Sequence, residues 1–196
     1  MRTIATASLG LVLPAVAVSP KLANGAEAGR MTDGKQTEKI LFASDRISGQ
    51  GTLNPEGDLE IFTVSPKGKK LEQLTSNAVD DFDPTFSSNG KISFVSQNVQ
   101  ASNPEGDSEV YLMDADGSDP RNLTNRTGTV SDQDPRFSAD GQKLAHTSFG
   151  VQPSNPEGDV EVYVMDAPDG ANPRNLTRTK SDVSDLQPDL EGAVGG

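Results

Sequence analysis

The pentapeptide Asn-Pro-Glu-Gly-Asp occurs three times, starting at Asn54, Asn103 and Asn155, and this repetition constrains the fold more than any other feature. The copies are about 50 residues apart, and each is followed by a segment of alternating side chains. A repeat of this length that contains several strand-like pieces is typical of a β-propeller blade, in which each repeat folds as one small sheet.

Other elements recur at fixed positions and predict four strands in each repeat. Asn-Gly and Asp-Gly pairs favour tight hairpin turns, because Gly adopts positive φ without strain. A first strand is expected around Phe86 and Phe137. Second strands are expected at 39–44, 91–96 and 143–148, and third strands at 59–64, 108–113 and 160–165. Fourth strands are expected to end at Leu74-Thr75, Leu123-Thr124 and Leu176-Thr177, and a partial first strand near Pro188 to Leu190.

The alternation within 108–113 predicts sheets that are covered on both faces. Val110 and Leu112 fall on one face of the strand, and Tyr111 and Met113 fall on the other. Two apolar faces must both be shielded from water, which favours blades packed against blades. No stretch shows sustained helical periodicity, so we expect an all-β fold with no substantial helix in the mature chain.

Composition excludes several classes of function. The chain has no Cys, which rules out disulfides, cysteine zinc sites and thiol catalysis. Its one His, His146, aligns with Phe42 and Phe94 and is expected to fill an aromatic packing position, so we predict no catalytic or metal-binding residue. A formal net charge of −12 argues against binding nucleic acid or an anionic membrane.

Residues 1–28 have the order of a secretory signal peptide. Met1-Arg2 is basic, Ile4 to Val18 contains no charge, and the small-x-small pattern of Ala26-Glu27-Ala28 follows. The apolar stretch is too short to span a bilayer. We expect cleavage near Ala28, or earlier after Ala17, and a periplasmic or secreted bacterial product that does not stay inserted in the membrane.

The repeats resemble the TolB-like propeller repeat, a WD40-like blade of bacterial exported proteins. The matching residues include Asp81-Phe82-Asp83-Pro84, Asp132-Gln133-Asp134-Pro135, and 109–117 with the sequence Glu-Val-Tyr-Leu-Met-Asp-Ala-Asp-Gly. The resemblance covers about 39–190. The family Trp is replaced by Phe86, Phe137 and Leu190, and the loops before each third strand are longer than the family pattern.

The resemblance implies a partial propeller of about three four-stranded blades, where TolB-like propellers usually have six. We expect a linker at 29–38, repeats at 39–77, 78–128 and 129–179, a partial strand within 180–190, and a flexible tail at 191–196. Two chains would complete a six-bladed ring as a homodimer. The alternatives are a truncated product, or an open arc whose exposed strand edges invite association.

The loops expected on one face of the blades are acidic. Clustered carboxylates can bind a basic partner or a cation such as calcium, but the same residues also form good turns and aid solubility. The candidate partner-binding or cation-binding residues are Glu56, Asp58, Asp81, Asp83, Glu105, Asp107, Asp132, Asp134, Glu157 and Asp159.

The sequence favours a non-catalytic binding or scaffold module at the cell envelope, since that is the role which the TolB-like resemblance implies. The partner is a protein, a peptide or a saccharide, and no cofactor is expected. One alternative is a structural module stabilised by calcium. Another is a remnant or accessory propeller of a hydrolase or lyase family, although one His leaves little material for such chemistry.

Overall fold

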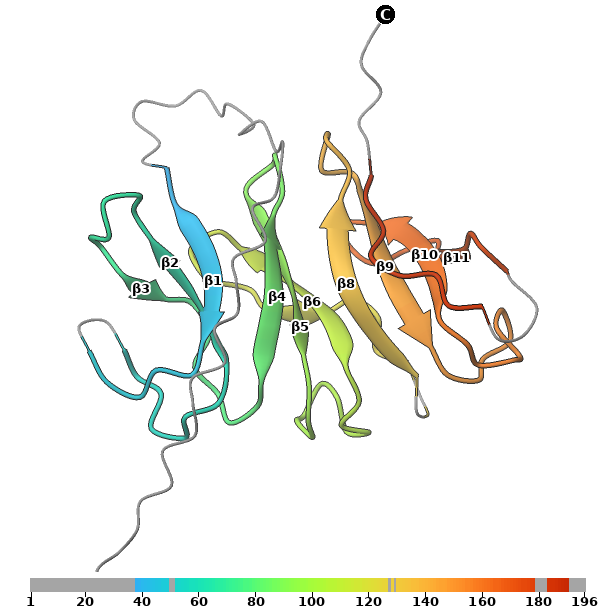
Figure 1. Cartoon of the computed structure of the whole chain (residues 1–196), viewed down its shortest axis with the longest axis horizontal. Coiled ribbons are helices and arrows are strands. Elements are labelled where there is room, and N and C mark those ends of the chain that lie inside the picture. The colour runs from blue at the N-terminus through green and yellow to red at the C-terminus, as the bar shows by residue number, and fades with distance from the viewer. Residues whose placement is uncertain (1–37, 50–51, 127, 129, 179–182, 191–196) are drawn as a thin grey trace, which may run out of the picture.

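The computed structural model describes residues 38–49, 52–126, 128, 130–178 and 183–190. All eleven elements of these residues are strands, and they form three antiparallel sheets that follow one another in an arc (Figure 1). The predicted all-β partial propeller is therefore confirmed. The signal peptide expected at 1–28, nearly all of the linker and the tail at 191–196 lie outside the described residues.

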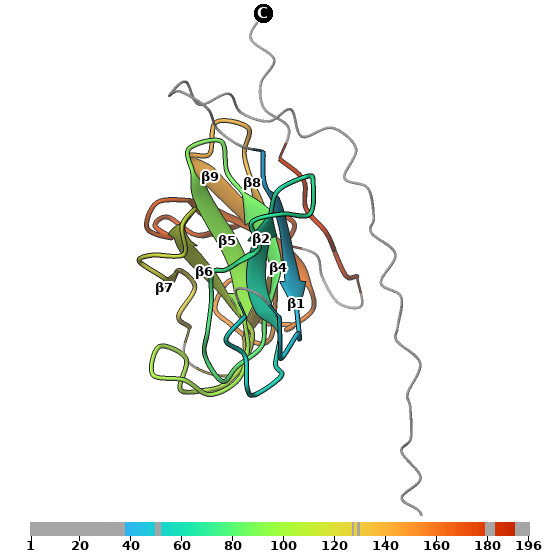
Figure 2. The same cartoon turned by 90° about the vertical axis from the view of Figure 1, so that its left-hand side faces the viewer.

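Each sheet is built from strands in chain order. The first contains β1 (Ile40–Ser44), β2 (Glu60–Val64) and β3 (Glu72–Gln73). The second contains β4 (Asp81–Phe86), β5 (Lys91–Ser96), β6 (Glu109–Asp114) and β7 (Arg121–Asn122). The third contains β8 (Ser131–Phe137), β9 (Lys143–Phe149), β10 (Glu161–Asp166) and β11 (Arg174–Asn175). Strands β1, β4 and β8 are neighbours along the arc, and Figure 2 views it from the first sheet.

The segment 183–190 forms no strand, in contrast to the expectation for Pro188 to Leu190. Its N–H at Asp185 donates to the carbonyl of Val160 (2.9 Å), as Asp81 donates to Leu59 and Asp132 donates to Ser108 at the starts of β4 and β8. The segment therefore begins along the path of a first strand. It is not a strand because none of the described strands pairs with it as β5 pairs with β4.

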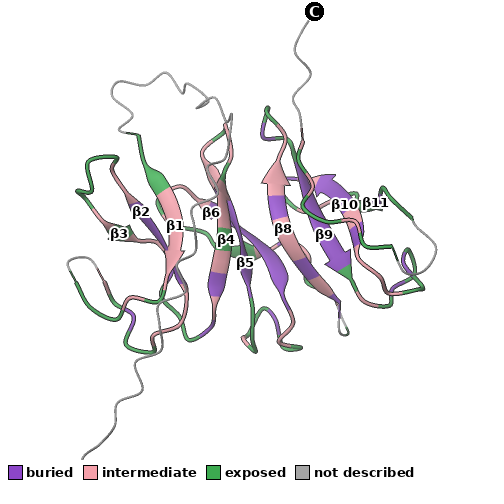
Figure 3. Ribbon diagram, viewed as in Figure 1, coloured by how far each residue is buried: buried purple, intermediate pink, exposed green. Residues whose placement is uncertain are grey.

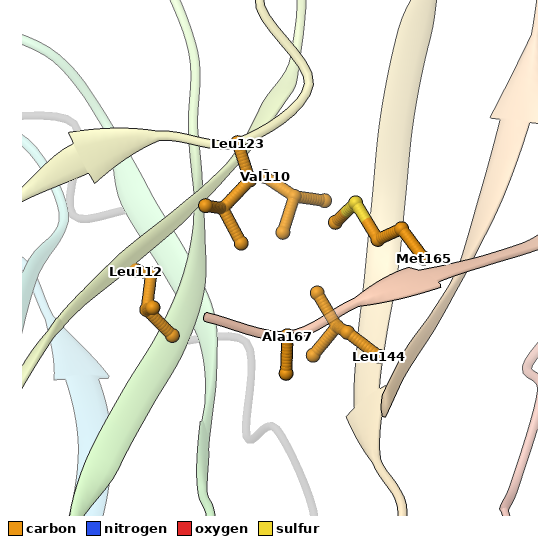
Figure 4. Close-up of a cluster of buried hydrophobic side chains, with 6 residues drawn as sticks. All are labelled: Val110, Leu112, Leu123, Leu144, Met165 and Ala167. Atoms are coloured by element: carbon orange, nitrogen blue, oxygen red, sulfur yellow. The ribbon is translucent and has the colours of Figure 1, made fainter. Parts of the chain in front are cut away.

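Apolar side chains pack between the sheets, as the alternation in β6 predicts. Val110 and Leu112 face the third sheet, where they join Leu144 and Met165 in one cluster (Figure 4). Tyr111 and Met113 belong to a separate cluster with side chains of β1, β2 and β5. The middle strands are consequently buried on both faces, and β1 is half-buried (Figure 3).

The Asn-Pro-Glu-Gly-Asp segments are turns held by the Asn side chain. Asn54 is buried; its Nδ2 donates to the carbonyl of Asp58 (2.7 Å), and its Oδ1 accepts from the N–H of Gly57 (3.0 Å). The same two bonds recur at Asn103 and Asn155. The pentapeptide repeats because one backbone turn repeats, with Asn as its internal acceptor and donor.

Two Gly residues allow neighbouring sheets to approach closely at their other end. A Cβ on Gly117 would lie 2.7 Å from the carbonyl oxygen of Leu74, and one on Gly170 would lie 2.5 Å from that of Leu123. Both Gly residues have positive φ. Gly68 occupies the corresponding turn of the first sheet, where a Cβ would meet no atom within 4 Å.

These turns make a matched pair of substitutions. Gly68→Ala should cost about 1–2 kcal/mol, because Ala is strained at positive φ. Gly117→Ala should cost about 1–3 kcal/mol more, because the added methyl also presses on a backbone carbonyl of the preceding sheet. Urea unfolding of both variants measures the difference. Equal losses of stability would show that the sheets are not in contact at this turn.

Candidate functional site

The connections that carry the predicted site residues lie at one end of the three sheets, along the lower edge of Figure 1. Glu56, Glu105 and Glu157 occupy the same position of the same turn in each repeat, and all three side chains are exposed. Asp58, Asp107 and Asp159 follow two residues later and are half-buried. We call this surface the acidic face, defined by these six residues.

Burial and like charge act on the half-buried members of the acidic face. Burial raises the pKa of Asp58; its own backbone N–H opposes this, and the nearby carboxylates of Glu56 and Asp80 add to it. Burial likewise raises the pKa of Asp107, with Glu105 contributing repulsion. No side chain among the described residues donates a hydrogen bond to the carboxylate of Asp58 or to that of Asp107. These carboxylates therefore concentrate negative charge at the base of each turn.

Asp81 and Asp132 differ from the other predicted site residues because they are fully buried. They begin the first strands of the second and third sheets, beneath the turns. Burial raises the pKa of Asp81 to about 6, although the neighbouring Ser96, Asn77 and Thr75 oppose the shift. Because both carboxylates are fully buried, they are not part of the exposed acidic face; Asp81 lines a pocket.

Asp83 and Asp134 lie in β4 and β8 at the same irregularity of the strand. Both have positive φ, 48° and 52°, and both precede Pro. Burial raises the pKa of Asp83, and the charge of Asp134 raises it further. The structure thus brings these two predicted residues near each other across adjacent sheets, apart from the acidic face.

Three further buried carboxyl groups were absent from the sequence prediction. Glu60, Glu109 and Glu161 begin the third strands and are at most 1% exposed. Each accepts a hydrogen bond from the Thr of the Leu-Thr pair, namely Thr75, Thr124 and Thr177. A Glu and a Thr recur at the same two positions in all three repeats. This recurrence is the sequence signal that could have identified the buried Glu residues.

These Glu residues link consecutive segments of each repeat. The backbone N–H of Asn77 donates to Glu60 Oε1 (2.7 Å), and that of Arg126 donates to Glu109 Oε1 (3.0 Å). Burial raises the pKa of Glu60 to about 7 and that of Glu109 to about 8, although the hydrogen bonds from Thr oppose the shift. The loops are therefore fixed from below by buried carboxyl groups.

His146 lies in β9 and fills the position of Phe42 and Phe94, as predicted. It is fully buried, and its ring centroid is 5.7 Å from that of Tyr163. Its Nε2 is 3.4 Å from Oδ1 of Asp132, whose Oδ2 is 3.4 Å from Nε of Arg126. The ring is part of the packing between the second and third sheets.

The described residues contain no group of three His, Asp or Glu side chains arranged to hold a metal ion. They also include no helix with the length and hydrophobicity that a membrane span requires. What the arrangement offers chemically is a surface of exposed carboxylates above buried, hydrogen-bonded ones. Such a surface is suited to electrostatic binding of a cationic group.

Comparisons with known proteins agree with this architecture. No protein-family profile matches the chain. A TolB homologue from Chlorobium luteolum is 32% identical over 136 residues, which cover 64% of this chain and 28% of the relative. A TolB structure from Agrobacterium tumefaciens superimposes with a TM-score of 0.51 and 19% identity, over 70% of this chain and 44% of that one. TolB from Acinetobacter baumannii gives 0.50 and 18%, over 71% and 30%.

The class of protein follows from fold and repeat together: this is a β-propeller repeat protein. The sequence likeness to a TolB homologue and the shared fold of two TolB structures confirm the predicted resemblance to TolB-like repeats. The chain spans less than half the length of each of these relatives. The likeness therefore concerns the propeller repeats.

The buried carboxyl groups predict that stability falls as pH rises from about 5 to about 8. The pKa values of Glu60 and Glu109 in the folded protein lie above the ordinary 4.5, and that of Asp81 lies above 3.8. Between the unfolded and folded values, the folded protein retains protons that the unfolded chain has released. The stability from these groups is complete below pH 4 and is lost as pH rises through about 6 to 8. Urea unfolding across this range measures it.

The variant Glu109→Gln tests whether Glu109 contributes to this pH dependence, because Gln stays neutral at every pH. The variant should show a flatter decline of unfolding free energy between about pH 5 and pH 8. Glu105→Gln, at an exposed position of the neighbouring turn, should keep the slope of the unmodified protein. A rise in stability over this range, or an unchanged slope in Glu109→Gln, would contradict the prediction.

Proposed function

We propose that this protein is a non-catalytic, exported binding module whose acidic face holds a basic segment of a partner protein in the bacterial cell envelope. The observation that carries the proposal is the repetition of an exposed Glu at one position of three equivalent turns, Glu56, Glu105 and Glu157. Repetition on adjacent sheets presents several carboxylates to one partner at once. Opposite charge on the partner would guide association and fix its register.

The charge distribution supports a partner that is basic. At the opposite end of the sheets, acidic side chains are interspersed with basic ones, including the ion pairs Lys91–Asp114 and Lys143–Asp166. The turns of the acidic face contain no Lys, and Arg46 and Arg126 at this end lie over aromatic rings. An acidic saccharide would be repelled from this surface, so a protein or peptide fits better than a saccharide of that kind.

Location and role are supported by the sequence. The pattern of residues 1–28 indicates export, and the TolB-like resemblance implies a scaffold role in the envelope. Because this chain matches only part of its relatives, partner and location are proposals for this chain. The absence of catalysis is likewise proposed for this chain, and turnover of a peptide or an acidic polysaccharide that is abolished by His146→Ala would overturn it.

Completion of a six-bladed ring by a second chain remains a separate prediction. Among the described strands β1 pairs only with β2, whereas β5 and β9 also pair with β4 and β8, so the other edge of β1 is open to a further strand. Light scattering of the mature protein should give twice the chain mass. A strict monomer at micromolar concentration would contradict ring closure.

Neutralising the acidic face should weaken binding of a basic probe. The triple variant Glu56→Gln, Glu105→Gln, Glu157→Gln removes three exposed charges without changing side-chain shape. Its affinity for a short peptide of alternating lysine and glycine should fall about 3- to 150-fold at low salt, since exposed pairs contribute about 0.2–1 kcal/mol each. Isothermal titration calorimetry measures the change.

A matched control lies at the opposite end of the sheets. Asp116→Asn, Asp140→Asn and Asp169→Asn remove the same number of exposed charges, and Asn keeps the oxygen that each turn N–H donates to. This triple variant should lose far less affinity for the lysine peptide. Equal losses in both variants would indicate non-specific attraction and would overturn the proposal.

A further inference from the structure

Each of the three sheets carries an aromatic pair on adjacent strands, namely β1 and β2, β5 and β6, and β9 and β10, and two of these pairs are covered by a guanidinium group. Arg46 lies over both rings of the first pair, 5.1 and 5.0 Å from the centroids, and Arg126 lies 5.2 Å from the ring of Tyr163 in the third. Among the described residues, no cation lies over the second pair. The three pairs are Phe42–Phe62, Phe94–Tyr111 and His146–Tyr163.

Arg126 shows what this position requires of a cation. Its Nε is 3.4 Å from Asp132 Oδ2, its terminal nitrogen donates to Oε1 of Gln152, and its guanidinium stacks on Tyr163. Its backbone N–H is anchored on the buried Glu109. One carboxylate, one amide oxygen and one aromatic ring therefore define the guanidinium site between the second and third sheets.

The same groups line a pocket between the first and second sheets. The pocket has a volume of about 260 Å³, and its lining includes Asp81, Gln100 and Tyr111, the counterparts of the three groups around Arg126. Asn77 occupies the position of Arg126 on the same backbone anchor, since its N–H donates to buried Glu60. Its short side chain reaches Asp81 Oδ2 (2.8 Å) and extends no further.

The side chains that line the pocket are held by the same hydrogen bonds as those around Arg126. Nε2 of Gln100 donates to Ser96 Oγ (2.8 Å), and the hydroxyl of Tyr111 bonds to Ser102 Oγ (2.7 Å). Equivalent bonds, 2.9 and 2.8 Å, hold the Gln and Tyr beside Arg126. Gln100 is half-buried where its counterpart Gln152 is buried. The pocket is therefore a preorganised site that opens to solvent.

Asp81 provides independent evidence that a donor belongs here. Its side chain is fully buried, and Oδ1 has no hydrogen-bond partner among the described residues. In the counterpart site neither oxygen of Asp132 makes a hydrogen bond either, but one faces His146 Nε2 and the other faces Arg126 Nε, each at 3.4 Å. Phe94 replaces that His and has no N–H to offer. A buried carboxylate oxygen without a donor is costly, so an incoming cation gains by supplying one.

We propose that this pocket binds the guanidinium group of an arginine side chain presented by the partner protein. The inference rests on the proposed binding function and names the chemistry of the partner. Guanidinium suits the site because it is planar, stacks on aromatic rings, and donates to a carboxylate and an amide at once. A lysine ammonium is a compact, strongly hydrated charge and meets these three demands less well.

In the first experiment, the mature protein is titrated with N-acetyl-arginine methylamide, and NMR spectra record the binding. Saturable shifts are expected at Tyr111 and Gln100. The citrulline analogue has nearly the same shape without the charge, and it should bind at least about tenfold more weakly. Equal binding of the two compounds, or no saturation by the arginine compound, would overturn the inference.

Substitutions that exchange the residues at positions 77 and 126 make the test specific. Asn77→Arg should fill the pocket from within, abolish binding of the arginine compound and raise Tm by a few degrees. Ala78→Arg adds the same charge at the exposed neighbouring residue and should leave binding nearly unchanged. Arg126→Asn should open a second pocket, so that the number of compounds bound rises from one to two. Binding unaffected by Asn77→Arg would overturn the inference.

Comparison of two peptides separates this inference from the proposed function. An alternating arginine–glycine peptide should bind more tightly than its lysine–glycine counterpart, and Asn77→Arg should remove that difference. If the peptides bind equally and both depend on the acidic face, the pocket inference fails and the proposed function stands. If the arginine compound binds its pocket but neither peptide depends on the acidic face, the proposed function fails instead.

Discussion

The packing of sheet against sheet is the interaction on which the rest of this structure depends. Strands β5, β6 and β9 are buried along nearly their whole length, because both of their faces carry apolar side chains. A single sheet of this kind would expose two apolar faces to water, so each sheet needs a neighbouring sheet to cover it. The close contact at Gly117 and Gly170 follows from the same requirement, since sheets that share a core must also meet at their turns.

The same geometry explains why so many acidic groups are tolerated at one end. The loops cannot pack as the sheets do, and they are fixed instead by polar groups beneath them. Asn54 closes its turn through its own side chain, and Glu60 holds both Thr75 and the backbone of Asn77. Burial keeps Glu60 and Glu109 protonated at higher pH than usual, which reduces the repulsion that several neighbouring carboxylates would otherwise produce.

Most of the fold could be predicted because strand periodicity and turn chemistry are local properties. The strands at 91–96 and 143–148 were located within one residue, since turns with Gly bound them on one side. The burial of individual acids could not be predicted in the same way. Asp81 and Asp83 are two residues apart, a spacing that puts regular strand residues on one face. One is buried and the other exposed, because the strand is irregular between Phe82 and Thr85.

Differences between repeats carry more information about binding than the features they share. The shared residues, such as the Glu and Thr of each third and fourth strand, are explained by folding. The residue whose backbone N–H donates to the buried Glu is Arg126 in one repeat and Asn77 in another. The strand that faces this residue carries His146 in the first case and Phe94 in the second. Together these two differences leave Oδ1 of Asp81 with no N–H group facing it and the Phe94–Tyr111 pair with no guanidinium over it, at the same place between the first and second sheets. A scaffold that repeats its structure thus exposes its candidate ligand site at the point where the repeats cease to be equivalent.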